Sequence, residues 1–159
     1  MKPLNNKIHR TILAGVGGQG VLLSGLVMAQ AAMKEYEHVI WLPQYEGPMR
    51  GGECSCFVVL SSQKVASPWR VTWDGAILMN EHAATLYKDS VRKDGTLVYD
   101  SSLATTEIDR SDLKLKAVPA LKLAMELGSR QCANFILLGA YLGLTPLVPR
   151  QQWLIQVVR

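Results

Sequence analysis

The feature that most constrains the fold of this chain is the regular alternation of strand-like runs with helix-like runs. The short apolar runs typical of strands cover Thr11–Ala14, His38–Leu42, Cys54–Ser61, Gly75–Met79, Thr96–Tyr99 and Lys114–Val118. The runs typical of helices cover Val21–Met33, Glu81–Lys88, Ala120–Leu127 and Gln131–Leu142. Strands that alternate with helices form βαβ units around a parallel sheet. We therefore predict a three-layer α/β/α domain with a mostly parallel, Rossmann-like sheet, which an antiparallel pair near Gln63 would make mixed.

The composition restricts the class of protein. The 159 residues suit one compact domain, and no repeat or linker divides them. Hydrophobic residues make up 48% and charged residues 19%, as in globular proteins. The 17 Lys and Arg residues are scattered, without the dense run that binds nucleic acid or anionic lipid. The polar start and the lack of a long apolar stretch argue against a signal peptide and a transmembrane helix. We expect a single cytoplasmic domain over residues 1–159 that binds neither nucleic acid nor membrane.

A glycine-rich loop follows the first predicted strand and opens the first predicted helix. It has the G-x-G-x-x-G spacing, in which glycines let backbone N–H groups approach an anion at a helix N-terminus. Dinucleotide binding also needs an acidic residue at the end of the second strand, where it holds the ribose hydroxyls. The second predicted strand ends Trp41-Leu42-Pro43-Gln44 and has no acidic residue there. Three interpretations remain: classical NAD binding, which the missing acid disfavours, a tight turn without a ligand, and a phosphate or acyl-carrier site. The residues of this candidate site are Gly15, Gly17, Gly18, Gln19 and Gly20.

A second loop, Pro43–Gly52, follows the second predicted strand. The Arg50 guanidinium could bind a phosphate or carboxylate, and Tyr45 adds a flat amphipathic surface. The alternative is a surface turn in which Arg50 pairs with Glu46 or Glu53. Loops that follow parallel strands emerge at one edge of the sheet, so we expect this loop beside the glycine loop. The candidate ligand-binding residues here are Tyr45, Met49, Arg50, Gly51 and Gly52.

The sequence nominates no catalytic residue and no metal ligand. A thiamine-diphosphate site needs a Gly-Asp-Gly motif. The two Asp-Gly dipeptides, at Asp74 and Asp94, follow Trp73 and Lys93 instead of glycine, so neither forms this motif. Iron–sulfur clusters need C-x-x-C runs, which are missing. The histidines are isolated, and the three cysteines, odd in number, indicate reduced core thiols: Cys54, Cys56 and Cys132. We expect the isolated chain to be colourless and inactive.

Two predicted helices are apolar almost all round. Val21–Met33 and the segment Ala133–Leu144 contain few polar residues, whereas a helix of a small domain usually has one polar face. A subunit interface that includes Leu26 and Leu138 would explain both helices. We therefore expect the isolated chain to self-associate.

Six segments in this order carry a resemblance to a known family: GVGGQGVLLSGLVMAQAA, WLPQYEGPMRGGECSC, LMNEHAATLY, LVYDSS, VPALKLAMELG and ANFILLGAYLG. Together they resemble the γ subunit, or fused γ domain, of the pyruvate, 2-oxoglutarate and branched-chain 2-oxoacid ferredoxin oxidoreductases. The resemblance runs from about Ile12 to Gly143. The second loop departs from the family pattern, because Glu46 stands before Gly47-Pro48 rather than after them. Relatives usually continue through another amphipathic segment, so the resemblance also implies a short or truncated C-terminus.

The resemblance implies an oxidoreductase role within a complex. Such enzymes make acyl-CoA, CO2 and reduced ferredoxin, with an iron–sulfur protein as electron acceptor. Thiamine diphosphate, Mg and iron–sulfur clusters lie on α, β and δ or ferredoxin-like partner subunits, and coenzyme A is the co-substrate. The γ part carries no cofactor and helps to bind or admit coenzyme A. Two other hypotheses remain open: a free-standing CoA- or nucleotide-binding protein, and a homo-oligomeric scaffold with a vestigial glycine loop.

Overall fold

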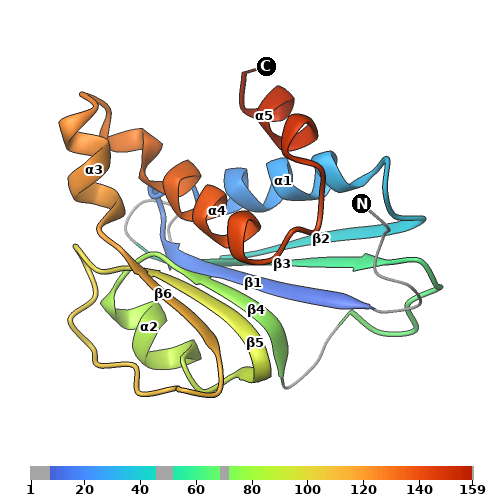
Figure 1. Ribbon diagram of the computed structural model, residues 1–159, viewed down its shortest axis with the longest axis horizontal. Coiled ribbons are helices and arrows are strands. Elements are labelled where there is room, and N and C mark those ends of the chain that lie inside the picture. The colour runs from blue at the N-terminus through green and yellow to red at the C-terminus, as the bar shows by residue number, and fades with distance from the viewer. Residues whose placement is uncertain (1–7, 46–51, 69–71, 159) are drawn as a thin grey trace.

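A computed structural model describes residues 8–45, 52–68 and 72–158 of the chain. Six strands form one sheet in the order β2-β3-β1-β4-β5-β6 (Figure 1). The strands are β1 His9–Val16, β2 His38–Tyr45, β3 Glu53–Ser61, β4 Trp73–Leu78, β5 Val91–Asp100 and β6 Lys114–Val118. The helices are α1 Val21–Ala32, α2 Glu81–Tyr87, α3 Ala120–Glu126, a 3-10 turn at Arg130–Cys132, α4 Ala133–Leu144 and α5 Arg150–Val158.

The sheet is mixed. Strands β1, β4, β5 and β6 are parallel neighbours, whereas β3 lies antiparallel to both β1 and β2. Strand β2 therefore runs in the same direction as β1, with β3 between them. The predicted α/β fold is confirmed, but the antiparallel pairs come from β3, and Gln63 lies in a turn closed by Ser61 Oγ at 2.9 Å from its N–H. Pro43 is tolerated within β2 because this strand lies at the edge of the sheet.

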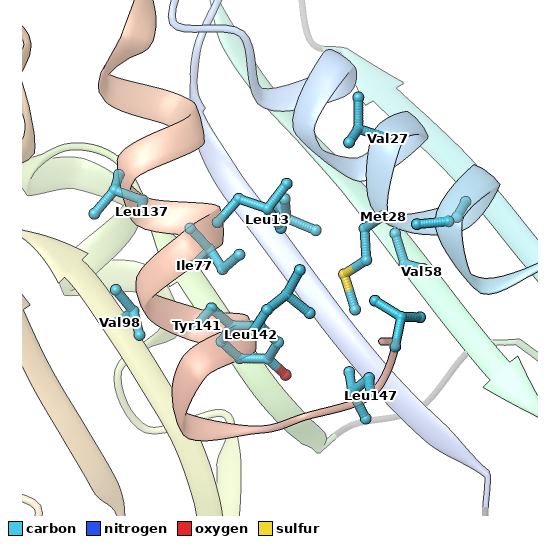
Figure 2. Close-up of a cluster of buried hydrophobic side chains, with 14 of the residues drawn as sticks. Leu13, Val27, Met28, Val58, Ile77, Val98, Leu137, Tyr141, Leu142 and Leu147 are labelled. Atoms are coloured by element: carbon cyan, nitrogen blue, oxygen red, sulfur yellow. The ribbon is translucent and has the colours of Figure 1, made fainter. Parts of the chain in front are cut away.

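Helices cover both faces of the sheet (Figure 1). On one face, α1 and α4 pack over the central strands in a core that includes Leu13, Met28, Ile77 and Leu137, all at most 1% exposed (Figure 2). On the opposite face, α2 and the segment after β5 cover a second core, whose members include Ile12, Leu97 and the stacked rings of Phe57 and Trp73. The sheet and the helices that cover its two faces are the three predicted layers, with one core on each face of the sheet.

Helix α5 was not predicted, and it changes the interpretation of the apolar helices. It packs on α1, and the segment before it buries Leu147 and Val148 beside α1 and α4. Leu138 is 0% exposed and belongs to the core, so its predicted place in a subunit interface is wrong. Much of the apolar surface of α1 and α4 is therefore covered within the chain. The large apolar side chains that α1 and its C-cap still expose are Leu23, at 50%, and Met33, at 68%.

Candidate functional site

The candidate site lies where the chain changes direction across the sheet. After β1 the chain builds β2 and β3 on one side, whereas after β4 it builds β5 and β6 on the other. Helix α1 follows β1 on one face, and α2 follows β4 on the opposite face (Figure 1). Ligands of α/β proteins bind in the crevice that such a reversal leaves at the carboxyl ends of the strands. A cavity of about 850 Å³ lies at this edge, and its lining includes Gly17, Gly18, Asn80, Asp100 and Arg130.

The glycine loop is braced from inside by Gln19. Its side-chain Oε1 accepts a hydrogen bond from the Val16 N–H at 2.9 Å, and its Nε2 donates to the Met79 carbonyl at 3.0 Å. Gly15 is buried within β1, and a Cβ there would lie 2.5 Å from Gln19 Oε1. Gly15 and Gln19 therefore fix the loop to the end of β4, and both polar groups of the Gln19 side chain are already bonded.

Two glycines of the loop have backbones that favour glycine. Gly18 has a φ of 98° and Gly20 a φ of 76°. A Cβ on Gly20 would lie 2.3 Å from Nδ2 of Asn134, which is 2% exposed and donates to the Gly20 carbonyl at 3.2 Å. A Cβ on Gly18 would meet nothing within 4 Å, so the backbone there is open to the cavity. No side chain caps α1, and its first N–H groups have no partner within the helix.

The second candidate loop meets the glycine loop as expected. The Gly17 N–H donates to the Gly52 carbonyl at 2.9 Å. Tyr45, at the end of β2, is 53% exposed and lines a smaller cavity of about 340 Å³ with Gly18 and Gly52. The loops meet because β1 and β2 point the same way across β3, not because they are adjacent strands. The remaining predicted residues, Met49, Arg50 and Gly51, lie outside the described residues.

Several polar residues at the crevice were not predicted. Asn80 caps α2 by accepting the Ala83 N–H at 2.8 Å, a position that its place after a strand and before Glu81 could have indicated. Asp100 is 1% exposed and accepts N–H groups of Ser102, Ala120 and Leu121 at 2.9, 3.1 and 3.0 Å. It ends β5 and holds the start of α3. Arg130 comes from the 3-10 turn before α4, where no sequence motif marked it.

Cys54 and Cys56 do not have the character of nucleophiles. Cys56 is 0% exposed, and burial raises its pKa to about 12. Burial also raises the pKa of Cys54. In the described part of the chain, no three His, Cys, Asp or Glu side chains gather as a metal site would require. These residues therefore do not fit an iron–sulfur cluster, which Cys thiolates hold in sets of four.

None of the described helices combines the length and the apolar composition that crossing a membrane requires.

The fold and the crevice define an α/β domain with a glycine loop and a cavity at a topological switch point. The chain belongs to the pyruvate ferredoxin/flavodoxin oxidoreductase family, whose model matches residues 10–159. It is 40% identical over 140 residues to the ketoisovalerate oxidoreductase subunit VorA of Methanothermobacter thermautotrophicus, covering 87% of this chain and 29% of that relative. It is 28% identical over 142 residues to the 2-oxoglutarate synthase subunit KorC of Methanocaldococcus jannaschii, covering 87% of this chain and 76% of that subunit.

Solved structures agree with this assignment. The γ subunit of a keto/oxoacid ferredoxin oxidoreductase from Geobacter sulfurreducens matches with a TM-score of 0.78 and 26% identity, over 95% of this chain and 83% of that one. The 2-oxoglutarate:ferredoxin oxidoreductase from Magnetococcus marinus matches in fold, with a TM-score of 0.84 and 24% identity, over 96% of this chain and 27% of that one. The chain thus spans less than a third of the longer relatives that it matches.

Proposed function

We propose that this chain is the γ-type subunit, or γ domain, of a 2-oxoacid:ferredoxin oxidoreductase and carries no cofactor itself. The assembled enzyme converts a 2-oxoacid and coenzyme A into acyl-CoA and CO2 and passes the electrons to ferredoxin. The observation that carries this proposal is the near-complete match of the domain to VorA, KorC and the Geobacter γ subunit. The crevice supports it, because its lining includes the open backbone of Gly18 and no cysteine.

We assign the decarboxylation and the electron transfer to partner subunits. We place thiamine diphosphate, Mg and the iron–sulfur clusters on α, β and δ or ferredoxin-like subunits, because this sequence contains neither a Gly-Asp-Gly motif nor a C-x-x-C run. Thiamine diphosphate stabilises the carbanion left by decarboxylation, and the clusters carry electrons away. The match covers 29% of VorA. The rest of that relative is long enough to contain partner domains.

The role of this chain is to bind coenzyme A at the crevice. The open backbone at Gly18 and the uncapped start of α1 are suited to a phosphate. Gly17 and Gly20 shape this loop, and Gly15 and Gln19 brace it. The residues of the second loop that we assign to the same site are Tyr45, Met49, Arg50, Gly51 and Gly52.

We also infer that the isolated chain self-associates and that it works in the cytoplasm. Leu23 and Met33 leave apolar surface exposed on α1 and its C-cap. Cys54, Cys56 and Cys132 are all free thiols, which suits a reducing compartment.

A tagged copy of the chain, expressed in its native host, is expected to co-purify with subunits that contain thiamine diphosphate and iron–sulfur clusters. The expectation rests on the family match and on the missing cofactor ligands in the described residues. Mass spectrometry together with iron and sulfide analysis of the eluate measures it. Recovery of the tagged chain alone, still able to bind coenzyme A, would instead support a free-standing binding protein.

Gly18→Ala is expected to weaken coenzyme A binding about tenfold or more, because its methyl group would stand between the loop backbone and a phosphate. The backbone strain of alanine at φ 98° adds about 1–2 kcal/mol of instability. Gly128→Ala is the matched control, since Gly128 has φ 79° and open space around it but ends α3 outside the cavity. Calorimetric titration with coenzyme A compares the two variants. Equal affinities in both would contradict a phosphate at Gly18.

A further inference from the structure

The two edge strands of the sheet differ in charge. Among the described strands, β6 forms one edge and β2 the other. Strand β6 is short and exposes Lys114 and Lys116, and lysines on a short edge strand disfavour pairing with a further strand. Strand β2 has 8 residues and contains no Lys, Arg, Asp or Glu from His38 to Tyr45. Of the two edges, the β2 edge is therefore the one that is open to another strand.

The helix beside this edge also leaves apolar surface open. A groove of about 430 Å³ lies between α1 and β2, and its lining includes Leu26, Met33, Val39 and Trp41. Met33, the C-cap residue of α1, is 68% exposed, and Leu26 is the α1 residue that was predicted to lie in a subunit interface. The groove is continuous with the strand edge, because Val39 and Trp41 belong to both. Together the edge and the groove form an apolar surface typical of subunit interfaces.

Pro43 indicates which residues of β2 can pair with a further strand. Proline has no N–H to donate, so in an edge strand its nitrogen faces away from the neighbour with which the strand is paired. The backbone groups of successive residues in a strand point in alternate directions. Val39 and Trp41 therefore direct their N–H and C=O groups outward, on the same side as Pro43, where an antiparallel strand can bond to both residues.

We propose that β2 pairs antiparallel with β2 of a second copy of this chain, about a two-fold axis at Ile40, so that the two sheets become one. In this register Val39 of each copy lies opposite Trp41 of the other, on the face that α1 covers. Pairs of an aromatic with a β-branched residue stabilise neighbouring strands. Ile40 lies opposite its own counterpart on the other face. The surface is thus self-complementary, as an interface with two-fold symmetry requires.

This inference goes beyond the proposed function, because it does not depend on coenzyme A. It names the surface through which the chain self-associates.

Ile40→Lys and Ile40→Glu test the pairing, because each would place two like charges opposite each other at the axis. Of the described residues, Ile40 belongs to neither core, so both variants are expected to fold. Sedimentation of the full chain is expected to show a dimer for the parent and dimerisation weakened about 100-fold or more in each variant. An equimolar mixture of the two variants is expected to restore the dimer, since opposite charges then face each other. Leu127→Lys is the matched control, because Leu127 is 74% exposed at the end of α3, which follows β6 at the opposite edge of the sheet.

Hydrogen exchange of the parent chain adds a measurement that needs no variant. The N–H groups of Val39 and Trp41 are expected to exchange more slowly at high protein concentration than at low concentration. Exchange that does not depend on concentration would contradict the pairing, even if a variant at Ile40 failed to fold.

Three sedimentation results would also overturn the inference. They are a monomeric parent chain, a dimer that persists unchanged in Ile40→Lys, and a mixture of the two variants that stays monomeric. None of them bears on coenzyme A binding or on co-purification with partner subunits, so the proposed function stands or falls by its own tests.

Discussion

Asp100→Ala is expected to lower the free energy of unfolding by about 3–5 kcal/mol, because it leaves three N–H groups without their acceptor. The carboxylate is 1% exposed and bonds to Ser102, Ala120 and Leu121. Ala120 is itself 0% exposed, so its N–H depends on the carboxylate as its acceptor in the folded protein. Urea denaturation followed by circular dichroism measures the loss.

Asp100→Ala is also expected to weaken the proposed binding of coenzyme A. Helix α3 places Leu121 in the cavity wall, and Asp100 holds the start of that helix. Asp109→Ala is the matched control, since Asp109 is an exposed acid in the segment between β5 and β6. It is expected to change stability by less than about 0.5 kcal/mol. If the two variants are equally stable, Asp100 does not anchor α3.

The alternation of apolar runs was enough to predict the three layers, but not the direction of every strand. The strand at Cys54–Ser61 was correctly predicted to be covered on both faces, and β3 does lie between β2 and β1. Its antiparallel direction depends on where the chain re-enters the sheet, which a local pattern does not record. Strand β2 was predicted to end at Leu42, yet it continues to Tyr45 because an edge strand tolerates Pro43.

Helix α4 was misinterpreted for a related reason, because Leu138 lies in the core and not in a subunit interface. A helix pattern shows how much surface must be buried, but not which segment buries it. Because α5 and the segment before it were not predicted, the apolar faces of α1 and α4 were assigned to a subunit interface, although α5 packs on α1 and Leu147 and Val148 join the core beside both helices. The polar Arg150-Gln151-Gln152 start of α5 gave little indication of a helix that packs on α1.

The candidate site was predictable in part. The glycine spacing located the loop, and the second loop was placed beside it, as the bond between Gly17 and Gly52 shows. The internal use of Gln19 was not predictable, because its partner Met79 is far away in sequence. Asn80, Asp100 and Arg130 come from the ends of three separate elements, so only the folded sheet brings them to one cavity.

The hydroxyl of Tyr141 makes buried polar contacts within the core that covers β4. Gly75 pairs with Thr11 on one side and Thr96 on the other, and the Tyr141 ring from α4 lies over this point. The Tyr141 hydroxyl lies 2.9 Å from His9 Nε2 and 3.0 Å from Thr11 Oγ1. Burial lowers the pKa of His9 to about 4, so its imidazole is neutral at pH 7. These bonds hold the ring, and with it α4, against the sheet.

Gly75→Ala is therefore expected to lower the free energy of unfolding by about 3–5 kcal/mol. Its Cβ would lie 1.8 Å from the Tyr141 hydroxyl oxygen and 2.6 Å from Cζ, so the whole ring must move and abandon its bonds. Gly143→Ala is the matched control, because Gly143 lies on α4 with nothing within 4 Å of an added Cβ. Alanine there is expected to stabilise the helix by about 0.5–1 kcal/mol.

A double-mutant cycle identifies the clash as the cause. Tyr141→Leu removes the ring and is itself destabilising, but it also frees the space that the methyl group added by Gly75→Ala would need. The double variant should therefore be more stable than the sum of the single losses implies, by at least about 1 kcal/mol of coupling. Thermal denaturation of the four proteins measures this. Strict additivity, or a loss below about 1 kcal/mol for Gly75→Ala alone, would mean that the ring moves freely and that the polar contact does not fix α4 on the sheet.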